Sequence, residues 1–309
     1  MRSVFIIFAI RSRPQTHSKL TSLSWLLGFN QYDEGFNLVS QKDTVKTILI
    51  FDSGVGGLSV YQEIYSLLPH YQYIYAFDDA AFPYGELEAS TLIERTLHIV
   101  KTLVDKHQAD LVVIACNTAS TIVLPHLRSA LNQPVVGVVP AIKPAAQLSQ
   151  SKVLGVLATP ATVKRQYTQS LIQEFAADCE VHLLGTTRLV EIAEMKLRGG
   201  RVDLSELAAI LQPWESTAID TVVLGCTHFP LMKEEIKKVF PQARHVVDSG
   251  NAIASRVQSL LAEDISSGRK WPVENLTYHT CDKSDHTALN ESLLAMQLSQ
   301  VRSLNYPRF

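Results

Sequence analysis

Two segments of this chain read alike, and this internal repeat constrains the fold more than any other feature. The segments are DLVVIACNTAS, residues 110–120, and DTVVLGCTHFP, residues 220–230. Each places a cysteine, Cys116 or Cys226, after a short apolar run rich in β-branched residues. Such a run is typical of a strand buried on both faces of a parallel sheet, and the polar residues that follow predict a loop at its carboxyl end. Open α/β sheets bind ligands at that end, so the two halves of the chain would present two thiols to one small molecule.

The repeat extends beyond the two cysteine segments. Residues 47–79 read as a buried strand, a glycine-rich turn, an amphipathic helix and a second strand, and residues 152–186 repeat that order. Aligning residues 51–53 with residues 157–159 gives an offset close to the one that separates the cysteines, which favours an internal duplication. Strands separated by helices of this length imply right-handed βαβ units and parallel sheets.

We therefore predict an α/β fold of two pseudo-symmetric, doubly wound domains with mainly parallel sheets and an active site in the cleft between them. The first domain would comprise residues 47–142 and 246–309, and the second would comprise residues 143–245. The return to the first domain is predicted from VVDSG at residues 246–250 and the helical pattern after it.

The first 46 residues do not share this pattern. Residues 4–10, VFIIFAI, form an apolar run between Arg2 and Arg11. The run is too short to span a bilayer and no A-x-A-like cleavage site follows it. We expect residues 1–46 to be a disordered extension or the product of a start codon assigned too far upstream.

Composition favours a soluble enzyme that works in the cytoplasm. A chain of 309 residues with 46% hydrophobic residues can bury a large core, and its net charge of -2 gives no electrostatic reason to bind nucleic acid or an anionic membrane. Four cysteines are too few for a disulfide scaffold, so reduced thiols are expected. No pair of cysteines has the CxxC spacing of a zinc site. Histidine, cysteine and aspartate residues do gather near the carboxyl end of the chain, at His279, Cys281, Asp285 and His286. Their spacing matches no standard zinc pattern, so we predict no metal.

The residues after the paired cysteines indicate a functional role for both thiols. A free cysteine in an apolar strand is usually a small core residue. Here Asn117 and Thr118 follow the first cysteine, and Thr227 and His228 follow the second. These side chains have no use in a core and suit hydrogen bonding to a polar ligand. Catalysis would use the thiolate form, which requires a polarised surrounding.

The glycine-rich turn DSGVGG, residues 52–57, leaves two interpretations open. Such turns between a strand and a helix often bind phosphates. The sequence is neither GxGxxG nor a Walker A motif, and no Lys-Ser/Thr pair follows it. Asp52 and Ser53, at the carboxyl end of the strand, are better placed to hold the ammonium and carboxylate of an amino acid. No lysine stands in a context that marks a pyridoxal phosphate site.

Several motifs together resemble the glutamate racemases, within the aspartate/glutamate racemase superfamily. They are FDSGVGGLSV, PYGE, ACNTAS, GVVPAIKPAA, LATPATVKRQYT and LGCTHFPL. The resemblance covers residues 47–262 and is strongest to the enterobacterial type. It implies a cytoplasmic isomerase that makes D-glutamate for peptidoglycan, and hence for cell-wall biogenesis and cell shape, without a cofactor.

The resemblance also implies roles for individual residues. Cys116 and Cys226 would be the two proton donors and acceptors. The implied substrate-binding residues are Asp52, Ser53, Tyr84, Gly85, Asn117, Thr118, Thr227 and His228. Asp78 and Glu191 would match the acidic residues that the family places behind the pocket. At the first of these positions the sequence AFDD, residues 76–79, departs from the Gly-Asp pair that is more widespread in the family.

Racemisation itself explains why two thiols are needed. The reaction removes the α-proton from one face of the substrate and returns a proton to the other face. A single base would tend to restore the original isomer, whereas two opposed groups, one thiolate and one thiol, invert the centre. Family precedent assigns Cys226 to deprotonating L-glutamate and Cys116 to deprotonating D-glutamate.

Alternatives remain open at this point. A racemase for aspartate or another small amino-acid derivative would share the two-cysteine logic, whereas a decarboxylating lyase of the same superfamily needs one cysteine. The enterobacterial resemblance implies activation by UDP-N-acetylmuramoyl-L-alanine and no membrane partner. Some glutamate racemases inhibit DNA gyrase, and the sequence neither supports nor excludes that role here.

Overall fold

The computed structural model describes residues 45–261, 274–281, 285–304 and 306. Most of the predicted extension, including the apolar run at residues 4–10, lies outside the described residues. Among the helices that the structure describes, none combines the length and apolar composition needed to cross a bilayer.

The first sheet has six strands in the order β10-β9-β2-β1-β3-β4, and every neighbouring pair is parallel. β1 at its centre, Thr47–Asp52, is buried along its whole length, as its continuous apolar run predicts. The other strands are β2 (Gln72–Phe77), β3 (Leu111–Ile114), β4 (Val135–Gly137), β9 (Leu276–His279) and β10 (Val301–Ser303).

The second sheet repeats the topology of the first. Its strands lie in the order β6-β5-β7-β8 and are again all parallel. They are β5 (Val153–Ala158), β6 (Glu180–Gly185), β7 (Thr221–Leu224) and β8 (His245–Val247). In both sheets the second strand of the repeat lies beside the first, and the third and fourth follow on the other side. The predicted α/β class with parallel sheets is confirmed.

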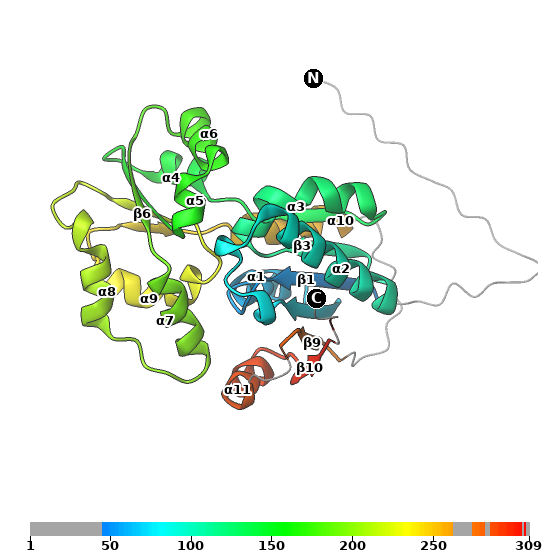
Figure 1. Ribbon diagram of the computed structural model, residues 1–309. Helices are drawn as coiled ribbons and strands as arrows, with labels where there is room; N and C mark the ends of the chain where they lie inside the picture. Colours follow the sequence, from blue (N-terminus) through cyan, green and yellow to red (C-terminus); the bar gives the residue numbers. More distant parts are fainter. Residues whose placement is uncertain (1–44, 262–273, 282–284, 305, 307–309) are drawn as a thin grey trace, which may run out of the picture. The chain divides into compact units, whose positions relative to one another are not determined.

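Eleven helices connect the described strands (Figure 1). They are α1 (Leu58–Leu67), α2 (Ala89–His107), α3 (Asn117–Ala130), α4 (Ile142–Leu148), α5 (Pro160–Lys164), α6 (Gln166–Phe175), α7 (Arg188–Leu197), α8 (Leu204–Leu211), α9 (Lys233–Val239), α10 (Gly250–Leu261) and α11 (Thr287–Ala295). Short 3₁₀ turns add η1 (Asp79–Ala81), η2 (Tyr84–Glu86), η3 (Gln212–Trp214) and η4 (Phe229–Met232).

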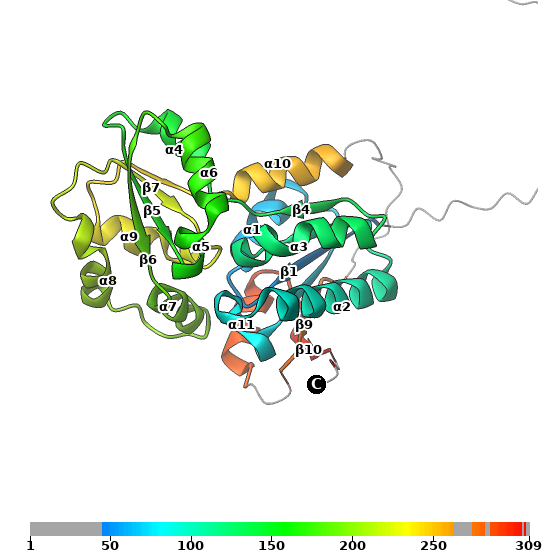
Figure 2. The ribbon, with the colours of Figure 1, turned by 45° about the horizontal axis from the view of Figure 1, so that its top comes forward.

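The helices cover both faces of each sheet. Along β1, Ile48 and Ile50 pack into a core with α1, α10 and α11, whereas Leu49 and Phe51 pack into a second core with α2 and α3. This is the period-two alternation of a strand that is buried on both sides. Figure 2 shows α2 and α3 running side by side over the sheet. The second sheet is covered in the same manner by α7, α8 and α9 on one face and by α4 and α6 on the other.

After β8 the chain returns to the first sheet. α10 packs against α1 and contributes Ile253 and Val257 to the first core, and β9 pairs with β2. β8 still belongs to the second sheet, so the return begins after Val247 rather than at residue 246. The division into two domains remains a prediction.

Candidate active site

Cys116 and Cys226 line a single cavity of about 200 Å³. The two cysteines occupy equivalent places, since the last paired residues before them are Ile114 of β3, beside β1, and Leu224 of β7, beside β5. The cavity is smaller than the ~300–1,000 Å³ of sites for drug-sized ligands, which suits a compact substrate. All ten predicted catalytic and substrate-binding residues line it: Asp52, Ser53, Tyr84, Gly85, Cys116, Asn117, Thr118, Cys226, Thr227 and His228.

Cys116 is held as a neutral thiol. It is the N-cap residue of α3, where its Sγ accepts a hydrogen bond from the Ala119 amide at 3.5 Å and lies 3.6 Å from the Ser53 hydroxyl. These contacts favour a thiolate, but burial and the nearby Asp52 carboxyl outweigh them and raise the pKa of Cys116 to about 12. Cys116 therefore carries its proton at neutral pH in the free enzyme.

Asp52 is fully buried at the end of β1, beside this thiol. Its Oδ1 accepts a hydrogen bond from the Ser53 amide at 2.7 Å, and its Oδ2 accepts one from the Gly57 amide at 2.6 Å. Burial raises the pKa of Asp52 to about 6, although His228 and the two amides favour the carboxylate. The carboxylate thus fixes both ends of the glycine-rich turn and remains charged above about pH 6.

Cys226 stands next to a buried histidine and carboxylate. Its Sγ lies 3.7 Å from His228 Nδ1, and His228 Nε2 lies 2.9 Å from Glu194 Oε1. Burial alone would lower the pKa of His228, but contacts with Cys226 and Glu194 raise it well above the ordinary value. Burial likewise opposes charge on Glu194, yet the contacts with His228 and the Val55 amide lower its pKa. The resulting imidazolium favours a thiolate at Cys226.

The glycines of the DSGVGG turn make room for this histidine and carboxylate. A Cβ at Gly56 would lie 2.3 Å from His228 Nδ1, and a Cβ at Gly54 would lie 2.7 Å from Glu194 Oε1. Both distances are far below van der Waals contact, so a larger residue at either position would displace the histidine ring or the carboxylate. The turn therefore makes room for the residues beside Cys226 and also positions Asp52 beside Cys116.

The prediction for Glu191 is wrong. Its side chain is half exposed and forms an ion pair of 2.7 Å with Arg188, away from the cavity. The carboxylate behind His228 is Glu194, three residues further along α7. Both glutamates occur in the motif LVEIAE, and the orientation of α7 decides between them. Its buried face carries Val190 and Ala193, and Glu194 is next to that face.

Asp78 lies behind the cavity and positions a residue that lines it. Its Oδ2 accepts a hydrogen bond from the Tyr84 hydroxyl at 2.6 Å, and both of its oxygens accept from Arg95 at 2.7–2.8 Å. Thr280 donates to the same carboxylate at 2.6 Å. Asp78 thus supports the cavity wall, whereas its neighbour Asp79 turns towards a different cluster.

Sequence reasoning missed the wall that the second sheet contributes. Thr159, Thr162, Thr187 and Val190 form this wall, and Phe82, which follows β2 of the first sheet, also lines the cavity. Thr159 is the counterpart of Ser53 in the alignment of the two repeats, and that alignment was the signal that could have found it.

Two hydrogen bonds connect the Cys226 loop to the residues around the first sheet, one from the Cys116 loop and one from α1. Asn117 Nδ2 donates to the Gly225 carbonyl at 2.9 Å, and the Ser59 hydroxyl donates to the Thr227 carbonyl at 2.7 Å. Asn117 Oδ1 is buried and accepts no hydrogen bond from the described residues. A buried acceptor without a donor is costly, so it is suited to a donor on a bound ligand.

Comparison with known proteins agrees with this geometry. Residues 48–257 match the family model for Asp/Glu/Hydantoin racemase. The glutamate racemase of Aliivibrio fischeri is 55% identical over 265 residues, which cover 85% of this chain and 99% of the relative. That of Vibrio cholerae is 56% identical over 84% of this chain and 97% of the relative. The chain belongs to the glutamate racemase family. The resemblance predicted from the motifs is confirmed.

Solved structures of the family share the fold. Escherichia coli glutamate racemase, crystallised with L-glutamate and the activator UDP-MurNAc-ala, superposes with a TM-score of 0.80 at 47% identity, covering 84% of this chain and 98% of that one. The isoform RacE1 from Bacillus anthracis gives a TM-score of 0.72 at 27% identity, over 85% of this chain and 98% of that one.

Proposed function

We propose that this chain is an isomerase that interconverts L- and D-glutamate for peptidoglycan synthesis, without a cofactor, by a two-cysteine mechanism. Membership of the glutamate racemase family supports the reaction. The observation that carries the mechanism is that Cys116 and Cys226 line one cavity in opposite surroundings, the first as a buried thiol and the second beside the imidazolium of His228.

In the direction from L- to D-glutamate, the Cys226 thiolate removes the α-proton and Cys116 delivers its own proton to the opposite face. The C–H bond broken at Cys226 becomes an S–H bond, and the S–H bond of Cys116 becomes the new C–H bond. Each turnover leaves Cys226 as the thiol and Cys116 as the thiolate, and proton exchange with solvent restores the starting state. In the opposite direction the two roles reverse.

The cavity supplies groups for both charges of an amino acid. The Asp52 carboxylate and Asn117 Oδ1 can accept hydrogen bonds from the substrate ammonium. The hydroxyls of Ser53, Thr118 and Thr227 can donate to the α-carboxylate, where charge accumulates as the α-carbon is deprotonated. Donors that are already positioned at such a charge lower the barrier because they need not reorganise.

Loss of optical activity measures the reaction directly. Purified protein should abolish the circular dichroism of L-glutamate and of D-glutamate, and Cys116→Ala or Cys226→Ala should each abolish net turnover. Cys179→Ala, which changes a partly exposed thiol outside the cavity, is the matched control and should retain activity. Full racemisation by either single cavity variant would exclude the two-base mechanism, and faster turnover of L-aspartate would exclude glutamate as the preferred substrate.

The proposal includes activation by UDP-N-acetylmuramoyl-L-alanine. The Escherichia coli relative, at 47% identity, was crystallised with the activator UDP-MurNAc-ala, and this supports testing the same nucleotide here. We expect low basal activity that rises strongly with the nucleotide. Equal rates with and without it would contradict this part of the proposal.

We place the reaction in the cytoplasm because thiolate chemistry requires reduced cysteines, which that compartment maintains. Inhibition of DNA gyrase is not part of the proposal, since no observation on the described residues favours it.

A further inference from the structure

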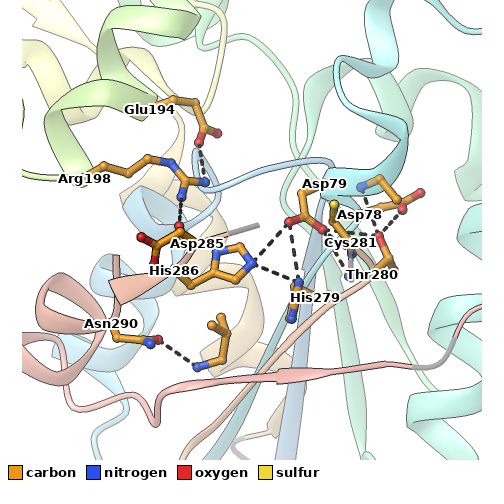
Figure 3. A network of polar contacts seen from close by, with 12 residues as sticks. Asp78, Asp79, Glu194, Arg198, His279, Thr280, Cys281, Asp285, His286 and Asn290 are labelled. Atoms are coloured by element: carbon orange, nitrogen blue, oxygen red, sulfur yellow. Dashed lines mark hydrogen bonds and ion pairs between the residues drawn. The ribbon is translucent and has the colours of Figure 1, made fainter. Parts of the chain in front are cut away.

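A cluster of two histidines and an aspartate lies outside the cavity, at the carboxyl edge of the first sheet. His279 is the last residue of β9, Asp79 follows β2, and His286 immediately precedes α11 (Figure 3). All three side chains are largely buried, and their ligand-type atoms lie within 4.8 Å of one another. The mechanism proposed above uses none of them.

The three atoms form a triangle close to the size that a tetrahedral metal requires, and its shortest edge is a hydrogen bond between the two histidines that a bound ion would replace. His286 Nε2 lies 3.0 Å from His279 Nδ1, and each of these nitrogens lies 3.6 Å from Asp79 Oδ2. Zinc binds nitrogen and oxygen at ~2.0–2.2 Å, so two ligands of a tetrahedron stand roughly 3.3–3.5 Å apart. The two separations of 3.6 Å are too long for hydrogen bonds but fit neighbouring ligands of one ion.

Neighbouring groups orient the carboxylate towards the histidines. Asp79 Oδ1 accepts hydrogen bonds from the amides of Thr280 and Cys281 at 3.1 and 2.9 Å, which directs Oδ2 to the two rings. The rings are fixed in turn by packing against Phe77, with centroids at 6.1 Å for His279 and 6.0 Å for His286. Ligands held in place before binding lose little freedom when the ion arrives.

We propose that Asp79 Oδ2, His279 Nδ1 and His286 Nε2 bind one divalent transition-metal ion, with zinc as the best fit, and that a water occupies a fourth position. Two imidazoles and one carboxylate suit zinc and its neighbours, whereas magnesium and calcium prefer oxygen ligands. The sequence predicted no metal because the third ligand comes from a distant segment. The Asp285 carboxylate is not one of the proposed ligands, because it accepts hydrogen bonds from the amide and the hydroxyl of Thr287 instead.

The site would secure the segment that contacts α7. The Ser292 hydroxyl of α11 donates to the Leu197 carbonyl at 2.7 Å. Arg198 reaches both the Asp285 carbonyl, at 3.5 Å, and Glu194, at 3.7 Å (Figure 3). An ion at His286 would therefore fix the start of α11, which lies against the end of the helix that carries Glu194.

The test must exclude metal binding by the cavity thiols. The full-length chain carrying Cys116→Ser and Cys226→Ser would be titrated with zinc in competition with a chromogenic chelator, and with cobalt(II) as a spectroscopic probe. We expect one equivalent of zinc per chain. Cobalt should show visible tetrahedral bands without a thiolate charge-transfer band, and amide exchange over residues 285–295 should slow when zinc is added.

His279→Gln and His286→Gln, each in that background, should abolish binding, and Asp79→Asn should weaken it. His126→Gln, at an exposed histidine of α3, is the matched control and should leave the stoichiometry at one. Circular dichroism would establish that each variant is folded. If a variant does not fold, the cobalt spectrum of the parent chain, which carries only Cys116→Ser and Cys226→Ser, still shows whether a tetrahedral site without thiolate ligands exists. Absence of zinc binding by the parent, a thiolate band in its cobalt spectrum, or one equivalent retained by folded His279→Gln and His286→Gln would overturn the proposal and leave a hydrogen-bonded histidine pair.

Discussion

At the scale of single residues, the main feature is the unlike surroundings of the two thiols. Cys116 has a buried carboxyl group and a hydroxyl nearby, whereas Cys226 has an imidazolium that is fixed by Glu194. Cys116 therefore keeps its proton at neutral pH, and the imidazolium can stabilise negative charge on the Cys226 sulfur. This arrangement supports the proposed assignment of Cys226 as the base for L-glutamate.

His228→Asn should reduce turnover of L-glutamate by about 10²–10⁴-fold, the range typical of a group that assists proton transfer. The variant retains a polar side chain but removes the positive charge 3.7 Å from Cys226. The rate should be measured as a function of pH. Its optimum should move to higher pH, because without the neighbouring positive charge the Cys226 thiolate forms less readily. An unchanged profile would show that the imidazolium does not activate Cys226.

Gly56→Ala should also impair the Cys226 side of the cavity. Its methyl group would meet His228 Nδ1 at 2.3 Å, so the ring must move away from Cys226 or from Glu194. We expect a loss of at least about 10²-fold in kcat, as is typical when a reacting group is misplaced by about 1 Å. Gly85→Ala is the comparison, since its methyl group meets Ala161 at an ordinary 3.5 Å and should cost much less.

The ionisation of Asp52 should be visible in the pH dependence of stability. Its pKa is raised from 3.8 to about 6 in the folded chain, so the folded state holds this proton more tightly than the unfolded state does. This contribution to stability is present below about pH 4 and is lost as the pH rises through about 6, by roughly 3 kcal/mol.

Urea unfolding at several pH values, compared between the natural chain and Asp52→Asn, isolates this contribution from that of other groups. The difference in unfolding free energy between the two proteins should shift in favour of Asp52→Asn as the pH rises. A difference that does not vary with pH would show that folding does not change the pKa of Asp52.

At the scale of elements, the repeat recurs in the way each third strand is anchored. Asp110 precedes β3 and accepts a hydrogen bond from the Thr47 amide at 2.7 Å, at the start of β1. Asp220 precedes β7 and accepts from the amides of Gln150 and Ser151 at 2.8 and 2.7 Å, just before β5. The same residue type therefore fixes the first strand to the third in both sheets, but Asp220 is buried and Asp110 is exposed.

Asp220→Ala should accordingly destabilise the chain by about 2–4 kcal/mol, because it leaves two backbone amides and the Ser149 hydroxyl without their acceptor. Asp110→Ala is the matched control and should cost about 1 kcal/mol, since water can replace the exposed carboxylate. Equal losses in chemical denaturation would indicate that burial does not distinguish the two anchors.

The sequence predicted the strands and the cavity more completely than the residues behind the cavity. Strand and loop positions follow from local patterns, so the repeat sufficed to predict that Cys116 and Cys226 lie in one site. The choice of Glu194 over Glu191 depends on how α7 is rotated against the second sheet, which local sequence does not specify. The meeting of Asp79 with His286 depends on pairing between β2 and β9, two strands that are far apart in the chain.

At the scale of the whole molecule, two sheets of the same topology share one cavity, and the backbone passes between them twice. Each sheet has its own apolar cores, which predicts that the second can lose structure before the first. Trp214 is central to one of these cores, where it is buried and packs against Phe240 with ring centroids 5.9 Å apart.

Trp214→Ala should cost about 3–5 kcal/mol and should increase amide exchange mainly in β5–β8. Leu103→Ala, in the core beneath α2, is the counterpart and should cost about 2–5 kcal/mol with its effect concentrated in β1–β4. Exchange that rises equally in both sheets, whichever side chain is removed, would show that the two sheets unfold as one unit.

The unlike protonation of the two thiols has a kinetic consequence. Enantiomers have equal free energies in water, so the equilibrium constant of the reaction is one. The Haldane relationship then requires kcat/KM to be the same for L- and D-glutamate, however different the catalytic groups are. Because Cys116 rests as the thiol, deprotonation of the D-isomer at Cys116 requires a less populated protonation state of the chain. The asymmetry should therefore appear as a paired difference in kcat and in KM that cancels in their ratio.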